Sequence, residues 1–165
     1  MSNLSSLASS LNTYHADPAL IAQVCVGLVR SWASGKDLDD MYRDLLRNAA
    51  DSSSVDQIVY QLEGDPEYAE NVGLIVLSAA WNYPELREEI QDLAAAAVES
   101  PRTVPSTELA QTVLYGMYLM ARHGAVVNQV AYRTPQGAIE TRVAEQGVAA
   151  AALFDTVREQ YGASL

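Results

Sequence analysis

Cysteine, histidine and lysine are scarce in this chain of 165 residues. Cys25 is the single cysteine, Lys36 is the single lysine, and there are two histidines. One cysteine excludes an internal disulfide, and one cysteine with two histidines is too few for a structural zinc site. The glycine-rich phosphate-binding motifs and the G-x-S-x-G nucleophile motif are also absent from the sequence. We therefore expect no metal and no cofactor, and the sequence does not favour an enzyme.

Long apolar runs are lacking as well. After the first sixteen residues, the longest uncharged stretches are 71–84 and 109–121, and both are shorter than the roughly 20 apolar residues that a membrane-spanning helix needs. The first sixteen residues have neither the basic region nor the continuous apolar region of a secretory signal peptide. We therefore expect a soluble, cytoplasmic protein that does not bind membranes.

Basic residues are also scarce in this chain. Ten Lys and Arg residues stand against 21 Asp and Glu residues, which gives a net charge of −11. Nucleic-acid phosphates and anionic lipids carry the same sign, so direct binding to either is disfavoured. The acids are concentrated in residues 37–99, where fifteen acids and three bases give a net charge of −12. The sequence therefore predicts, if anything, a basic protein as partner.

Two interpretations of this acidic segment stay open. Its carboxylates are either the solvated backs and first-turn caps of amphipathic helices, or an anionic face that docks a basic protein. Capping explains Asp37 and Asp65 but not the whole surplus of charge. A calcium site is not indicated, since residues 37–48 lack the glycine and glutamate of a calcium-binding loop. The residues predicted to form the docking face are Asp39, Asp40, Asp44, Glu85, Glu88, Glu89 and Asp92.

Capping residues and a 3.6-residue apolar period predict a mainly α fold. Asp17-Pro18 and Asp65-Pro66 each place a capping carboxylate before a proline at the first helical position. Ser54 and Gln57 form a capping box for a short helix. Segments 18–33, 68–81 and 107–121 are apolar on almost every side, which is typical of central helices. The predicted helices cover residues 18–34, 37–49, 54–63, 66–81, 84–99, 106–123 and 148–161.

A β-hairpin is predicted near residues 126–144, because β-branched residues alternate on either side of Thr134-Pro135-Gln136-Gly137. Two strands are marginal alone, so the hairpin must pack on the helices or meet a partner strand, for example in a homo-oligomer. The expected organisation is an N-terminal extension (1–16), a bundle of about six helices (17–123), and the hairpin with a final helix packed on the bundle (124–165).

Several single residues remain as candidates for chemistry or binding. His123 is placed at a helix end, where an imidazolium is stabilising, and no nucleophile is tied to it by motif or spacing. Cys25 has apolar neighbours and is expected to be an inert core residue. An aromatic set at helical spacing either belongs to the core or lines a ligand pocket between helices. The aromatic residues of this candidate pocket are Tyr60, Trp81, Tyr115 and Tyr118.

Three functions follow from these observations. The first is a non-catalytic interaction protein, such as an adaptor, an inhibitor or immunity-type partner, or an assembly subunit, which docks a basic partner through the acidic face. The second is a helical small-molecule-binding or sensor domain with an aromatic-lined pocket. The third is an enzyme of unfamiliar design that relies on His123 and a carboxylate.

Overall fold

The computed structural model describes residues 6–49, 52–122, 129–143 and 157 of the chain. These residues form seven helices and a two-stranded antiparallel sheet, so the predicted mainly α fold is confirmed. The predicted bounds of the six helices between residues 17 and 123 agree with the observed ones to within two residues. The elements are α1 (Leu7–Thr13), α2 (Pro18–Trp32), α3 (Leu38–Asn48), α4 (Ser52–Gly64), α5 (Pro66–Ala80), α6 (Pro84–Glu99), α7 (Ser106–Arg122), β1 (Gln129–Arg133) and β2 (Ile139–Val143).

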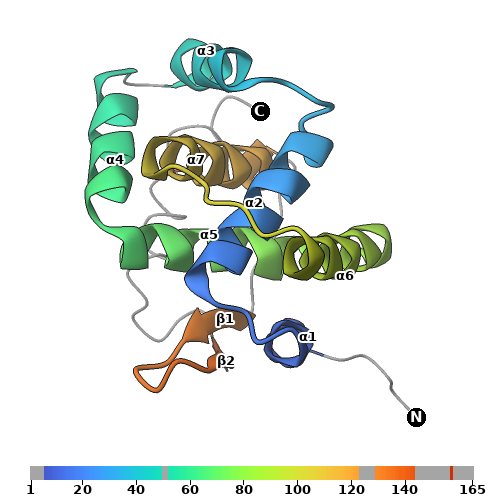
Figure 1. Cartoon of the computed structure of the whole chain (residues 1–165). Coiled ribbons are helices and arrows are strands. Elements are labelled where there is room, and N and C mark those ends of the chain that lie inside the picture. Colours follow the sequence, from blue (N-terminus) through green and yellow to red (C-terminus); the bar gives the residue numbers. More distant parts are fainter. Residues whose placement is uncertain (1–5, 50–51, 123–128, 144–156, 158–165) are drawn as a thin grey trace.

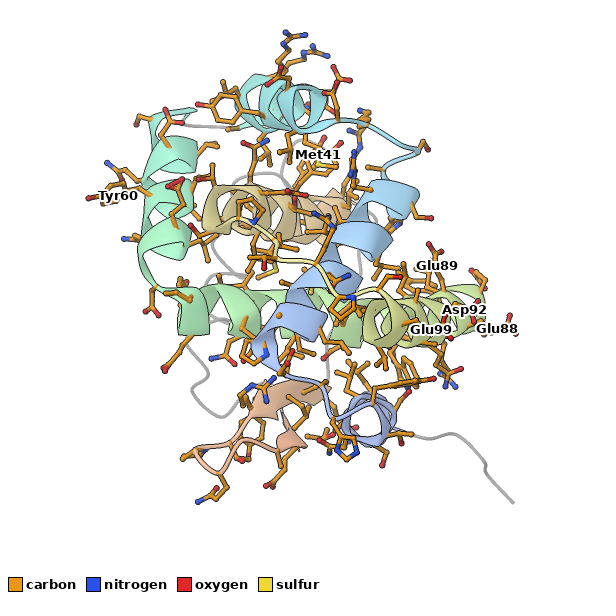
Figure 2. The ribbon with its side chains drawn as sticks, viewed as in Figure 1. Met41, Tyr60, Glu88, Glu89, Asp92 and Glu99 are labelled. Carbon is orange, nitrogen blue, oxygen red and sulfur yellow. The ribbon has the colours of Figure 1, made fainter. Side chains whose placement is uncertain are left out.

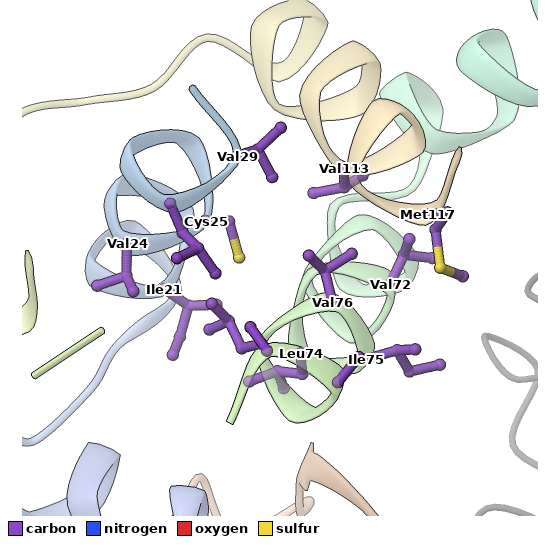
Figure 3. Packing of buried hydrophobic residues seen from close by; sticks show 14 of the residues in the cluster. Ile21, Val24, Cys25, Val29, Val72, Leu74, Ile75, Val76, Val113 and Met117 are labelled. Carbon is purple, nitrogen blue, oxygen red and sulfur yellow. The ribbon is translucent and has the colours of Figure 1, made fainter. Parts of the chain in front are cut away.

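Helices α2, α5 and α7 form the centre of the molecule, and each contacts the other two (Figure 1). They are the three segments whose sequences are apolar on nearly every side, and most of their side chains are buried. Figure 3 shows Cys25 and Val29 of α2 meeting Val76 of α5 and Val113 of α7 in the shared core. In the described part of the chain, no helix is both long enough and apolar enough to cross a membrane.

Two glycines allow these central helices to approach closely. A Cβ atom at Gly73 would lie 2.7 Å from the Sγ atom of Cys25, and one at Gly116 would lie 3.0 Å from Val29 and from Val76. The thiol of Cys25 therefore sits against the backbone of α5 without exposed surface. Burial, and next the charge of Glu70, raise the pKa of this thiol well above its usual range. The expectation of an inert core cysteine is confirmed.

The amphipathic helices cover the central three. α3 and α4 pack on α7, and α6 packs mainly on α2 (Figure 1). Met41 of α3 is fully buried and lies between α3 and α7 (Figure 2). Each outer helix buries one stripe of apolar residues, as the periodicity predicts, and its other side faces away from the core.

Most of the helix starts follow the predicted caps. The side chain of Asp17 accepts a hydrogen bond from the N–H of Leu20 at 2.8 Å, and Asp65 accepts one from Tyr68 at 3.1 Å. The predicted capping box of Ser54 is wrong, because α4 already begins at Ser52. A run of three serines offers several equivalent starts, so the cap alone does not determine where this helix begins.

The hairpin forms where it is predicted, within residues 126–144. β1 pairs with β2 in a register that places Ala131 opposite Thr141. At the turn, Gly137 has a φ of +94° and donates its N–H to the carbonyl of Thr134 at 2.9 Å. Glycine adopts this left-handed conformation without a steric penalty, which is why the turn ends on it. The hairpin packs on α5 through β1, as expected, and on α1 through β2.

Helix α1 lies in the segment that the sequence analysis treats as an extension with no helix of its own. Ser6 caps it by accepting a hydrogen bond from the N–H of Ser9 at 3.0 Å. Leu7, Ala8 and Leu11 are buried in the core. α1 therefore belongs to the folded unit and covers part of the hairpin. About two turns of helix with two leucines are too short to show a reliable apolar period, so the pattern alone does not reveal α1.

The predicted final helix at 148–161 lies outside the described residues, apart from Val157, which is buried in the core. His123 also lies outside the described residues. The enzyme hypothesis that depends on His123 is therefore not examined by the structure.

Candidate functional site

The predicted acidic residues separate into two groups on different helices. Asp39, Asp40 and Asp44 lie on α3, whereas Glu85 and the remaining three acids lie on α6. The two helices pack on different members of the central trio, α3 on α7 and α6 on α2 (Figure 1). The structure therefore presents two acidic surfaces, and their local environments differ.

On α3 most of the carboxylates already have partners. Asp37 caps the helix, accepting from the N–H of Asp40 at 2.9 Å, and the Asp40 carboxylate lies 4.0 Å from Arg43. The side chain of Asp44 is only 15% exposed and forms an ion pair with Lys36. Asp39 is exposed, and no ion pair of its side chain is found among the described residues. Two of the three acids of α3, Asp40 and Asp44, therefore already lie beside a basic side chain.

Asp44 is the centre of a polar cluster that joins α3 to α7. Its carboxylate also accepts a hydrogen bond from the phenol of Tyr115 at 2.8 Å, and Arg47 lies 3.9 Å away. Burial alone would raise the pKa of Asp44, but the hydrogen bonds from Lys36 and Tyr115 and the charges of Lys36 and Arg47 outweigh it and lower this pKa. Burial and the contact with Asp44 raise the pKa of Tyr115 to about 12. Asp44 is therefore a structural residue in this fold.

On α6 the acids form a single stripe. Glu85, Glu88, Glu89, Asp92 and Glu99 follow the three- and four-residue spacing that places side chains on one face of a helix. We call these five residues the α6 stripe. Its opposite face carries Ile90, Ala94 and Ala97, which are buried. Figure 2 shows the four labelled acids of the stripe together on the outer side of α6.

The charges of the α6 stripe are not compensated. Within the described residues, none of the five carboxylates takes part in an ion pair or a side-chain hydrogen bond. Arg87, the only base on α6, is directed elsewhere. Its guanidinium donates two hydrogen bonds to the carbonyl of Trp81, at 2.9 and 3.0 Å, and lies 5.2 Å from the centre of the Trp81 ring. The stripe therefore carries negative charge that no residue in the described part of the chain neutralises through an ion pair.

The four aromatic residues of the predicted pocket are not brought together. Tyr60 lies on α4 with 78% of its surface exposed, on the side of the molecule away from α6 (Figure 2). Tyr115 and Tyr118 of α7 are buried with their ring centres 5.3 Å apart. Trp81 is buried at the end of α5. Two of the four are thus neighbours within the core, and none of the hollows described below is lined by more than one of the four.

Trp81 does border a hollow of about 340 Å³ between α1, α5 and the hairpin. Its lining combines polar and apolar side chains, none of them charged. The residues that line it are Ser6, Leu7, Ser78, Trp81, Asn82, Gln129, Ala131 and Thr141.

A second hollow, of about 530 Å³, lies at the turn of the hairpin beside Pro18, Pro66 and Pro135. The one basic group in its lining, Arg133, forms hydrogen bonds of 2.8 and 3.0 Å with Glu70. The guanidinium of Arg133 is thus already hydrogen-bonded to another residue of the chain. This hollow offers no basic group that is free to bind a ligand.

A third hollow, of about 430 Å³, adjoins the α6 stripe. Trp32, Tyr83, Glu85 and Leu86 line it, so it lies where the last turn of α2 meets the first turn of α6. Trp32 and Tyr83 are half-buried, and Glu85 is exposed. No sequence motif predicts this hollow. In the sequence, only Trp32 at the end of α2 and Tyr83 at the start of α6 hint at it. No pattern of neighbouring residues shows that these two helix ends meet.

Among the described residues, no group of three or more His, Cys, Asp or Glu side chains is arranged to hold a metal ion. The chain matches no protein-family model, and its comparison with curated proteins and with solved structures finds no similar protein.

Proposed function

We propose that this chain is a non-catalytic interaction protein that docks a basic protein partner through the α6 stripe. The observation that carries this proposal is a set of five carboxylates on one helix face that form no ion pair with any residue the structure describes, while Arg87, the base of the same helix, bonds to Trp81. The proposal narrows the predicted docking face to Glu85, Glu88, Glu89 and Asp92, with Glu99 added. The acids of α3 are left out because Asp44 is paired within the fold and Asp40 lies beside Arg43.

The arrangement of the stripe is unfavourable for the isolated helix, which supports a role outside the fold. Glu85 with Glu89, and Glu88 with Asp92, are like charges four residues apart, and such pairs destabilise a helix. Glu99 lies in the last turn of α6, where no basic residue offsets the negative end of the helix dipole. A basic partner would remove this repulsion on binding, and opposite charges would raise the association rate.

An adaptor, an inhibitor or immunity-type partner and an assembly subunit all fit this proposal. The docking is tested with two triple variants of equal net charge. The first is Glu88→Gln/Glu89→Gln/Asp92→Asn on the stripe. The second, the control, is Asp39→Asn/Asp40→Asn/Glu67→Gln, which neutralises exposed acids of α3 and α5.

The probe is a nine-residue polylysine peptide, titrated at two salt concentrations by isothermal calorimetry. We expect the stripe variant to lose most of the binding and most of its salt dependence, whereas the control variant keeps both. Equal losses in the two variants would mean that net charge alone attracts the peptide, and the stripe would then serve only solubility.

A small-molecule-binding domain remains the second candidate, and the hollow beside Trp81 favours it. A ring next to hydroxyl and amide groups, in a hollow whose lining residues carry no charge, suits an uncharged polar ligand such as a saccharide. Thermal-shift measurements with mono- and disaccharides test this candidate, with Asn82→Leu as the variant that removes a lining amide. A shift in the wild type that Asn82→Leu abolishes would support it.

A further inference from the structure

The hollow between α2 and α6 combines aromatic walls with a carboxylate. Trp32 and Tyr83 supply two aromatic side chains, Leu86 supplies an apolar one, and Glu85 supplies a charge. Glu85 is also the first residue of the α6 stripe, so the hollow and the stripe form one continuous surface. A volume of about 430 Å³ accommodates one long side chain of a partner together with water.

The electrostatics of this hollow favour a cation. The carboxylate of Glu85 forms no ion pair with any described residue, and Arg87 is held at the carbonyl of Trp81. Trp32 is the last residue of α2, where the helix dipole places partial negative charge that Arg30 in the same turn partly offsets. The first turn of α6 contributes partial positive charge, which Glu85 offsets from within the same turn. The faces of aromatic rings also attract cations.

We infer that this hollow binds one arginine side chain of the basic partner and so determines where the partner sits on the stripe. The inference rests on the proposed docking function and specifies its anchor. A guanidinium is planar, stacks on aromatic rings and pairs with a carboxylate in two parallel hydrogen bonds, whereas an ammonium forms only point contacts. The stripe supplies long-range attraction, and the hollow supplies the discrimination between arginine and lysine.

The test uses the full chain and two small probes of nearly equal shape, N-acetyl-arginine amide and N-acetyl-citrulline amide. Citrulline keeps the planar head group but carries no charge. The readout is the NMR signal of the tryptophan indole N–H groups during titration. The chain has two tryptophans, and Trp81→Phe assigns their signals.

We expect the arginine amide to shift the Trp32 signal in a saturable way and to bind at least about five-fold more tightly than the citrulline amide, a difference within the usual range for a cation on an aromatic ring. Glu85→Gln should weaken arginine binding by about three-fold or more. Tyr60→Leu, which removes an exposed aromatic residue on α4, should leave it unchanged. Equal binding of both amides, or equal shifts of Trp32 and Trp81, would overturn the inference.

A peptide comparison separates this inference from the proposed docking. In Trp32→Leu, nonaarginine should lose its advantage over nonalysine, while nonalysine still binds through the stripe. If nonaarginine still binds more tightly than nonalysine in Trp32→Leu and in Glu85→Gln, the proposed arginine site is wrong, although the proposed docking through the stripe is not contradicted. If the stripe variant binds nonalysine as well as the wild type does, the docking itself is wrong.

Discussion

The side-chain amide of Asn12 forms with Ile139 the two hydrogen bonds that a neighbouring β-strand would form. The Nδ2 group of Asn12 donates to the carbonyl of Ile139 at 2.8 Å, and the N–H of Ile139 donates to Oδ1 of Asn12 at 3.1 Å. α1 thereby closes the edge of β2 at this residue. An incoming strand therefore cannot pair with β2 at Ile139.

Asn12→Ala should lower the free energy of unfolding by about 1–3 kcal/mol, because two backbone groups of a partly buried strand lose their partner. Urea denaturation measures this difference. The matched control is Asn48→Ala, which removes an amide that bonds only to the carbonyl of Asp44 one turn earlier in its own helix. Equal effects of the two substitutions would show that the contact between α1 and β2 contributes nothing specific.

Gly73→Ala should destabilise the fold by about 1–3 kcal/mol, because the added methyl group would lie 2.7 Å from Sγ of Cys25 in a closely packed core. Combining it with Cys25→Ala should restore part of the loss, since the smaller side chain makes room. Gly64→Ala is the control, because nothing lies within 4 Å of the added group. Thermal melts of the four variants check this prediction, and additive losses in the double variant would contradict it.

Glu70 and Arg133 form an ion pair that joins α5 to the hairpin, with 9% and 18% of their side chains exposed. Arg133 also donates to the carbonyl of Ala16 at 2.8 Å and to that of Gly137 at 2.7 Å. Arg133→Met should destabilise the protein by about 3–5 kcal/mol, because it leaves Glu70 buried without its partner.

Adding Glu70→Leu to Arg133→Met should recover part of this stability, as the unpaired buried charge is then gone. A double-mutant cycle measured by urea denaturation separates the pair's interaction from the other contacts of Arg133. If the double variant is less stable than Arg133→Met alone, the buried charge is not the source of the loss.

Asp44 should make stability depend on pH in the acid range. Its pKa is lower in the folded chain than in the unfolded chain, so the unfolded chain binds the proton more tightly. The stabilisation is complete above the unfolded pKa of about 4 and is lost as the pH falls through the folded pKa. Asp44→Asn should therefore be less stable than the wild type at pH 7, and this difference should shrink below about pH 4.

Urea unfolding at several pH values measures this dependence. Asp39→Asn is the control, because that carboxylate is exposed on the same helix and belongs to no ion pair in the described part of the chain. A difference for Asp44→Asn that stays constant from pH 7 to pH 3 would contradict the assigned role.

Helices α2 to α7 and the hairpin turn could be predicted from the sequence, because the interactions that place them are local. Asp17 and Asp65 cap backbone groups three residues away, and Gly137 closes a turn of four residues. The α6 stripe is likewise contained in the spacing of its acids, since a helix brings residues three and four positions apart onto one face.

Only the tertiary structure decided which charges remain outside the fold. Asp44 meets Tyr115, 71 residues away, and Glu70 meets Arg133, 63 residues away. The spacing of nearby residues predicts neither pairing, because each depends on which distant helices and strands pack together. The same holds for the hollow of Trp32 and Tyr83, which exists only because the end of α2 lies against the start of α6. Local sequence determines which residues share a helix face, and packing between distant segments determines what that face contacts.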